Sequence, residues 1–407
     1  MASVSSASEP RRVQASRRAI GLGTALLIGL NLRPAITSAA ALLDQAAAWF
    51  DLTAVEASLL PTLPVIAFGL TAPVPPLVAR RLGVTRTLAW TMVALAAALV
   101  MRVLAPGGML IGTFLVGAAI MAAGTLLPQY LKSLSAGGLW IGLSSMSFSA
   151  GAALGAGLTV PVSDAVNPPL ALGMWAVPAV IALLAVFAIA RHPGPRPGGD
   201  RRMRVTRDAL PTVALTTAVF GLQAMVFFAV TAWLPQILGD RGVDPVTAGW
   251  LLAWFSIVGL IPTLLAPILA QRPRILAWFG PGLGAVMVIA FAWLASGDGS
   301  YFAITTVLGV VQSAAFGLSL AMIVRQAANE ASAGILSAFA QGVGYAFAGA
   351  GSLLVGVLHD VTGGWTAGLV LMIGVAAALS VVVALVIRRP AVDLLSPVGT
   401  RSASARE

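Results

Sequence analysis

Residues 20–47 read IGLGTALLIGLNLRPAITSAAALLDQAA, an apolar run interrupted by Asn-Leu-Arg-Pro at 31–34. A membrane-spanning helix needs about 20 mainly apolar residues, so this stretch is long enough to cross a bilayer. It is too long for the apolar part of a cleavable signal peptide, and we expect it to remain as a membrane helix. An arginine in the middle of such a run is costly, which makes Arg33 the first candidate for a functional residue.

The composition of the whole chain points to the same class of protein. The 407 residues are 58% hydrophobic and 9% charged, and the mean hydropathy is +0.94. Soluble domains have about a quarter of their residues charged. A bilayer allows the outer surface of a protein to be apolar, so the expected fold class is an all-α membrane protein.

Twelve membrane spans are predicted, in two sets of six that a polar, Pro- and Gly-rich linker at 191–208 separates. The tails are residues 1–19 and 388–407, and the two halves cover 20–190 and 209–387. The first six spans are expected at 20–47, 55–79, 87–105, 109–131, 137–160 and 170–190. The second six are expected at 209–238, 246–270, 275–296, 301–324, 333–358 and 365–387.

Basic residues predict the orientation. If the N-terminus is cytoplasmic, 21 of the 24 Lys and Arg residues fall in cytoplasmic segments, as the positive-inside rule requires. Arg102 and Arg241 remain outside, and both termini are expected in the cytoplasm of a bacterial cell with this protein in its inner membrane. The net charge of +10 is therefore explained by topology, and we expect no nucleic-acid partner.

The two halves carry a similar short sequence at equivalent places. Arg86-Thr-Leu-Ala-Trp90 opens the third span and Arg274-Ile-Leu-Ala-Trp278 opens the ninth, 188 residues later. Internal repeats of this kind are common in transporters whose halves are related by duplication. The sequence thus favours a six-plus-six architecture.

Polar residues inside the spans are candidates for solute contacts, because each is expensive in lipid. Spans three, six, nine and twelve contain no Asn, Gln, Asp, Glu, Lys or His in their apolar bodies, and Arg102 lies only at an outer end, so we expect these four spans to face lipid. The other spans would surround a polar cavity. Their polar residues are Asn31, Arg33, Gln129, Gln223, Gln312, Gln341 and Tyr345.

Arg33 is the sharpest of these candidates. Its guanidinium is always charged and offers a planar fork of donors that suits carboxylate-like or nitro-like oxygens. Pro34 removes a backbone donor and can bend the helix at the same place. The alternative is a structural arginine bonded to helix carbonyls.

The remaining candidates have equally plausible structural explanations. A lone membrane glutamine forms an interhelical hydrogen bond as often as it contacts a ligand. Phe227 and Trp233 are able to stack on a planar solute, although aromatic residues in membrane helices more often serve packing. We expect the tryptophans near span ends to be interfacial anchors, namely Trp49, Trp90, Trp175, Trp278 and Trp365.

The sequence lacks the residues that several kinds of chemistry require. The chain has no cysteine, and its one lysine, Lys132, follows Leu131, so no nucleotide-binding P-loop exists. No cofactor, metal site or catalytic residue is expected, although Gly142-Leu-Ser-Ser145 is similar to a motif of intramembrane serine proteases. No carboxylate lies at mid-membrane, which leaves Asp44 as the candidate for proton coupling, with a solvated helix end as the alternative.

Three motifs together resemble one family. Asn31-Leu-Arg-Pro34, Gly221-Leu-Gln223 with Ala232-Trp-Leu-Pro235, and Leu358-His-Asp-Val-Thr-Gly-Gly-Trp365 are similar to the cyanate and nitroimidazole transporter group of the major facilitator superfamily. The resemblance covers residues 20 to about 390 and implies a monomeric carrier of a small polar or anionic solute, with Arg33 and Gln223 at its cavity. The alternative is a proton-coupled multidrug or metabolite antiporter. Pro76 and Arg80, where the wider superfamily has Gly and Asp, argue against it.

Overall fold

The computed structural model describes residues 11–60, 62–104, 107–190, 201–203, 206–297 and 299–397. The first half contains α1 (Arg11–Leu30), α2 (Pro34–Ala41), α3 (Leu43–Trp49), α4 (Ala54–Leu59), α5 (Leu63–Thr71), α6 (Val74–Leu82), α7 (Val84–Leu104), α8 (Gly108–Ser133), α9 (Gly138–Ala165), α10 (Pro168–Gly173) and α11 (Ala176–Ala190). The second half contains α12 (Leu210–Gly239), α13 (Pro245–Val258), α14 (Leu260–Leu269), α15 (Pro273–Ser296), α16 (Tyr301–Gln326), α17 (Glu330–Thr362) and α18 (Thr366–Ile387). Two short strands, β1 (Arg201–Met203) and β2 (Leu395–Pro397), complete the described part.

The number of membrane helices agrees with the prediction. Within the described residues, eleven helices are long and apolar enough to cross a membrane, and a bent pair, α5 and α6, brings the number up to twelve. The pair bends by 53°. Pro73 lies at the bend and Pro75 and Pro76 follow it, and proline removes the backbone donors that would continue one straight helix.

The first span is broken where the sequence placed Arg33. Helix α1 ends at Leu30, and α2 begins at Pro34, whose ring fixes its backbone and which has no N–H to donate. The connecting residues make tighter turns, in which the amides of Asn31 and Leu32 donate to the carbonyls of Ile28 and Gly29 at 3.0 and 3.1 Å. Helix α9 packs against this break because Gly151 and Gly155 leave no side chain there; a Cβ at either position would overlap α1 or α2.

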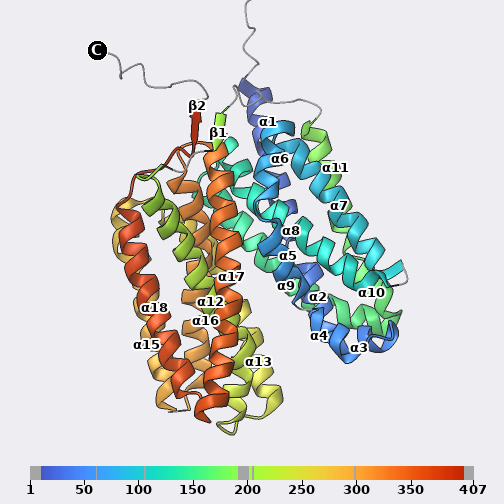
Figure 1. Ribbon diagram of the computed structural model, residues 1–407, viewed down its shortest axis with the longest axis vertical. Coiled ribbons are helices and arrows are strands. Elements are labelled where there is room, and N and C mark those ends of the chain that lie inside the picture. Colours follow the sequence, from blue (N-terminus) through green and yellow to red (C-terminus); the bar gives the residue numbers. More distant parts are fainter. Residues whose placement is uncertain are drawn as a thin grey trace, which may run out of the picture.

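The two halves lie side by side and diverge toward one end (Figure 1). They are joined toward the end that carries β1 and β2, where Lys132 Nζ donates to the Val324 carbonyl at 3.1 Å. At that end α9 also packs on α14, and α17 packs on α8. The start of α1 and strand β2 lie at this same end, as an even number of spans requires (Figure 1). We refer to it as the strand end.

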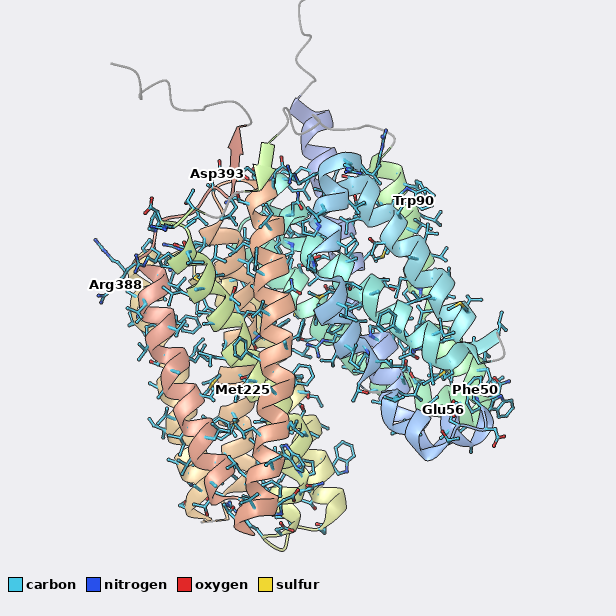
Figure 2. The ribbon with its side chains drawn as sticks, in the orientation of Figure 1. Phe50, Glu56, Trp90, Met225, Arg388 and Asp393 are labelled. Carbon is cyan, nitrogen blue, oxygen red and sulfur yellow. The ribbon has the colours of Figure 1, made fainter. Side chains whose placement is uncertain are left out.

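The four helices that the sequence predicted to face lipid lie at the edges of the molecule. Helices α7 and α11 lie at one edge of the molecule and α15 and α18 at the other (Figure 1). Trp90 lies on the outer side of α7, while Phe50 and Glu56 mark the end opposite Arg388 and Asp393 (Figure 2). Large apolar side chains on these helices are exposed, among them Leu184, Ile289 and Val381, as expected for a surface that lipid covers.

Two of the predicted interfacial tryptophans are buried instead. Trp49, Trp90 and Trp278 are exposed as expected, whereas Trp175 and Trp365 are 6% and 8% exposed. Their indole N–H groups explain the difference, because each has a partner inside the protein. Trp175 Nε1 donates to Thr159 Oγ1 at 3.1 Å and Trp365 Nε1 to Asp240 Oδ2 at 2.7 Å. The anchor prediction is wrong for these two.

The predicted linker contains a strand that the sequence did not reveal. Residues 201–203 form β1, which pairs antiparallel with β2, so that Arg202 lies opposite Ser396. Residues 191–200 and 204–205 lie outside the described residues. The tail next to β2 is held by backbone bonds, since Val392 N donates to the Gln326 carbonyl and Ala328 N donates to the Val392 carbonyl.

Candidate functional site

Arg33 lies at the break in the first span, between the two halves, and its side chain is partly buried. Its guanidinium carbon is 4.7 Å from the centre of the Phe148 ring on α9 and 5.3 Å from that of Phe227 on α12. The Tyr345 side chain on α17 also interacts electrostatically with this guanidinium. A cation over aromatic faces is stabilised without neutralisation of its charge. The site is thus a permanent cation enclosed by aromatic groups from both halves.

A central cavity of about 70 Å³ adjoins Arg33. Its walls include Phe148, Phe228, Gln341 and Tyr345, and most of the rest is apolar. A second space of about 20 Å³, toward the strand end, shares Phe148, Gln341 and Tyr345 with it. Because a water molecule needs only about 10–15 Å³ on this measure, the central cavity has room for a few waters or a solute of a few atoms.

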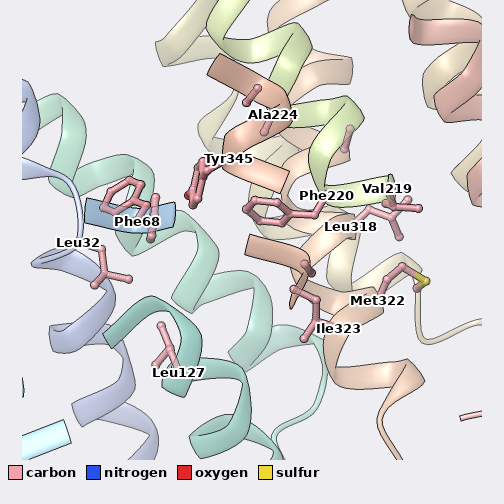
Figure 3. Packing of buried hydrophobic residues seen from close by; sticks show 14 of the residues in the cluster. Leu32, Phe68, Leu127, Val219, Phe220, Ala224, Leu318, Met322, Ile323 and Tyr345 are labelled. Carbon is pink, nitrogen blue, oxygen red and sulfur yellow. The ribbon is translucent and has the colours of Figure 1, made fainter. Parts of the chain in front are cut away.

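Tyr345 is held in place by other rings. Phe68 of the first half lies 5.0 Å away between ring centres, and Phe220 of the second half lies 5.2 Å away edge to face. Figure 3 shows Tyr345 between these two rings, where the halves meet. Edge-to-face packing of this kind fixes ring orientation. The Tyr345 hydroxyl is therefore a preorganised partner for Arg33 or for a solute.

Gln341 links the two halves beside the cavity. Its Nε2 donates to the Gly124 carbonyl of α8 at 2.9 Å and to Ser337 Oγ, one helical turn earlier in α17, at 2.7 Å. The side chain is buried and lines both cavities. It therefore serves the contact between halves and is also within the site.

Gln223 and Gln312 lie together inside the second half. Gln312 Nε2 on α16 donates to the backbone carbonyl of Gln223 at 2.8 Å and to its Oε1 at 3.2 Å. Each residue is 1% exposed, and the Gln312 Oε1 has no hydrogen-bond partner. Gln223 is one helical turn from Phe227 on α12, so the pair lies behind the ring that covers Arg33.

Asn31 and Gln129 are placed away from the cavity. Asn31 Nδ2 donates to the Leu27 carbonyl at 2.8 Å and to the Pro178 carbonyl of α11 at 3.1 Å, which fastens the broken end of α1 to its neighbour. Gln129 is buried beside Gly334 of α17, on the strand-end side of Gly124, and its Oε1 has no partner. Both side chains support the walls of the site.

Trp233 and Asp44 lie elsewhere. The Trp233 ring is 5.6 Å from that of Trp365, near the end of the second half opposite the strands. The His359 ring stacks on the Trp365 ring, with 3.9 Å between the two ring centres. Asp44 belongs to α3, and its side chain lies outside the described part of the structure.

Arg102 is a buried residue that the sequence placed at an outer end. It is 0% exposed. Its two terminal nitrogens donate to the carbonyls of Ala35 at 3.0 Å and Leu172 at 2.9 Å, with Ser38 Oγ at 3.4 Å. The guanidinium thus fastens α2 and α10 to α7, and its Nε has no partner.

Phe148, which contacts Arg33 most closely, was not among the predicted residues. It is the one aromatic residue in Gly142-Leu-Ser-Ser-Met-Ser-Phe-Ser149, a run of small residues in the fifth span. Small residues bring α9 close to α1, and Phe148 then fills the space in front of the break. A large ring among small residues next to a broken helix is a signal that sequence reasoning could have used.

The electrostatic setting of Arg33 is unusual for a membrane arginine. Its guanidinium lies near the rings of Phe148 and Phe227 and interacts with the Tyr345 side chain. All carboxylates of the described residues lie near helix ends or in connections, as in Asp51, Asp164 and Asp240. No group of three His, Asp or Glu residues that could hold a metal ion is found within the described ranges. The arrangement can attract an anion or an electron-rich planar group into a small apolar space.

Comparison with known proteins identifies the family. A family model described as Major Facilitator Superfamily matches residues 21–349. The "Uncharacterized transporter YycB" of Bacillus subtilis is 31% identical over 86% of this chain and 88% of its own length. From Escherichia coli, the "2-nitroimidazole transporter" is 30% identical over 84% and 88%, and the "Cyanate transport protein CynX" is 30% identical over 84% and 90%.

Solved structures agree on the fold. The proton:xylose symporter XylE, bound to 6-bromo-6-deoxy-D-glucose, superposes with a TM-score of 0.71 at 13% sequence identity. The match covers 91% of this chain and 95% of the other. The expected architecture is therefore confirmed, as is the resemblance to the cyanate and nitroimidazole transporter group.

Proposed function

The chain belongs to the major facilitator superfamily, a family of multi-pass transporters, and we propose that it carries a small planar anion or electron-rich solute across the bacterial inner membrane. Cyanate, nitroheterocycles and small organic anions represent the expected class. The names of two relatives, a nitroimidazole transporter and a cyanate transport protein, support this choice. Arg33 is the proposed anchor for the solute.

One observation carries the proposal, namely that the Arg33 guanidinium, which lies close to the Phe148 and Phe227 rings, lines a cavity of about 70 Å³. A permanent cation in a low-dielectric space attracts an anion much more strongly than it would in water. Aromatic rings of Phe148, Phe228 and Tyr345 line this cavity, and they suit a flat molecule. Tyr345 and Gln341 line the same cavity and are proposed to contact the solute, while Asn31, Gln129, Gln223 and Gln312 hold the walls.

The proposed transport cycle is alternating access between the two halves. They are packed together toward the strand end and diverge toward the other end (Figure 1). With the orientation predicted from the basic residues, the strand end is cytoplasmic, and the structure corresponds to an outward-facing state. Rocking of the halves would then part α8 from α17 and α9 from α14.

The orientation has its own test. Reporter tags at the N-terminus, within 191–208 and at the C-terminus should all report from the cytoplasm. A periplasmic report from any one of them would contradict the topology.

Coupling is proposed to be exchange or facilitated diffusion, because none of the described carboxylates lies beside Arg33 to take up a proton. Asp44 is the remaining candidate for proton coupling, which the antiporter alternative requires. The deciding measurement between these mechanisms is gradient-driven uptake into proteoliposomes that contain the Asp44→Asn variant. Loss of accumulation with retained exchange would favour the antiporter, and unchanged accumulation would remove Asp44 from the mechanism.

The test of the solute class is ligand binding to purified protein, because a ligand that binds the folded state raises the melting temperature. The panel consists of cyanate, nitrate, 2-nitroimidazole and small carboxylates, with unsubstituted imidazole as a matched compound that lacks the nitro group. We expect stabilisation by one or more of the anions or nitro compounds, and none by imidazole. Stabilisation by imidazole equal to that by 2-nitroimidazole would contradict the proposed role of the electron-rich oxygens.

A further inference from the structure

Another cavity, separate from the two described above, lies on the outer surface, away from the solute site. It has a volume of about 190 Å³ and runs between the α5–α6 bend and α17. Gly69, Leu77 and Arg80 form one wall, and Phe339, Gly342 and Val343 form the other. We refer to it as the lateral groove. It is larger than the cavity beside Arg33, yet no residue of the solute site lines it.

The groove lies along the bend in the second span. Residues on both sides of the 53° bend line it, namely Gly69 and Ala72 before it and Pro76 and Leu77 after it. Gly69 contributes no side chain, and no atom lies within 4 Å of the place where its Cβ would be. Across the groove, Gly342 approaches Ala72 so closely that a Cβ there would lie 2.6 Å from the Ala72 methyl. The floor is closed by this contact while the mouth stays open.

The walls of the groove suit hydrocarbon. Leu77, Phe339 and Val343 are 50%, 37% and 41% exposed. Helices α5, α6 and α17 are long and apolar enough to belong to membrane spans, so we expect lipid, not water, to be the surrounding solvent. Water would find few polar partners along this surface. A flexible acyl chain has both the shape and the chemistry to occupy it.

Charge is confined to one end of the groove. Arg80 is the only charged residue among those that line it, and it is partly exposed in the last turn of α6. Arg81 beside it is exposed as well. Both lie toward the strand end, where the basic residues of the chain place the cytoplasmic headgroup layer. Anionic lipids of that leaflet are attracted to juxtamembrane Lys and Arg residues.

We propose that the lateral groove binds one acyl chain of an anionic phospholipid, whose phosphate pairs with Arg80. The lipid then contacts α5 and α6 of the first half and α17 of the second. A ligand that touches both halves across their closed contact stabilises the conformation in which they are together. The lipid would therefore favour the state with a closed strand end, independently of the solute.

The experiment compares lipid retention by matched glycine variants of the full chain. Gly69→Leu fills the groove, and Gly157→Leu on α9, where the Cβ position is equally open, is the control. Protein in mixed detergent micelles is titrated with phosphatidylglycerol or phosphatidylcholine, and the bound lipid is counted by native mass spectrometry. We expect one tightly held phosphatidylglycerol in the wild type, at least tenfold weaker retention in Gly69→Leu and a change below twofold in Gly157→Leu.

Arg80→Gln tests the recognition of the lipid headgroup separately from the binding of the acyl chain. It should remove the preference for phosphatidylglycerol over phosphatidylcholine and leave the retention of phosphatidylcholine unchanged. If Gly69→Leu does not fold, Leu77→Trp fills the groove from the other side of the bend and should have the same effect. Equal lipid retention by the groove-filling and control variants, or a wild type without preference between the two lipids, would overturn the proposal.

Discussion

Two arginines of the first half lie within membrane spans and are used in opposite ways. Around Arg102, the terminal nitrogens meet the backbone carbonyls of Ala35 and Leu172, and the side chain is sealed from the surface. Around Arg33, the guanidinium meets the faces of Phe148 and Phe227 and one tyrosine side chain. Carbonyls use up the donors of an arginine, whereas rings stabilise its charge and leave donors free. The partners, not the depth, separate a structural arginine from one that can bind a solute.

The largest effect is expected from Arg102→Ala. The change removes a charged donor from two buried carbonyls and leaves space at the junction of α2, α7 and α10, which we expect to cost about 3 kcal/mol or more. Arg102→Met fills part of the volume and should cost less. The melting temperature of purified protein measures this effect. A wild-type melting temperature in Arg102→Ala would erase the distinction between the two arginines.

Arg33→Ala should reverse the pattern. Loss of two charge-assisted hydrogen bonds, at about 1.5 kcal/mol each, predicts about a hundredfold weaker binding of the solute. The melting temperature should be unchanged or higher, because an arginine at mid-bilayer costs about 2.5–3.5 kcal/mol. Arg33→Lys keeps the charge without the planar fork and should bind about tenfold more weakly than wild type.

The control for these variants is Arg81→Ala, which removes an exposed positive charge at the strand end and should leave solute affinity unchanged. If Arg33→Ala binds the identified solute like wild type, or only unfolds, Arg33 is structural like Arg102.

Gly112→Ala tests the packing around Arg102 and leaves the arginine itself in place. A Cβ on α8 at this position would lie 2.6 Å from the Arg102 Cα, so α7 and α8 must separate. Overpacking of this kind typically costs about 1–3 kcal/mol. Gly282→Ala on α15, where the Cβ position is open, is the matched control for the melting temperature. Equal melting of the two variants would show that the junction around Arg102 is loose.

The smallest effect is expected from Phe148→Leu. The ring stabilises the charge of Arg33 by about 0.5–1 kcal/mol, which corresponds to about a twofold to fivefold loss of solute affinity. Phe347→Leu, an exposed position on α17, should leave the affinity unchanged. Equal affinities would mean that the rings only fill space around Arg33.

The fold could be predicted from the sequence almost completely, and the site only in part. Apolar length follows from the thickness of the bilayer itself, so it predicted the membrane spans. Asn31-Leu-Arg-Pro34 predicted the broken helix, because proline acts on its own backbone. Arg102 could not be judged in this way, since its partners come from α2 and α10, which are distant in sequence. The joining of Gln223 to Gln312 depends on the same kind of long-range contact.

The pairing of β1 with β2 determines the length of the chain segment that connects the two halves. Strand β2 follows a segment that is bonded to the connection between α16 and α17, so β1 travels with the second half. In the sequence, ten residues, 191–200, connect α11 to β1. Ten residues can reach at most about 33–36 Å when fully extended. That contour length sets the upper limit on how far α11 can move from β1 as the halves rock.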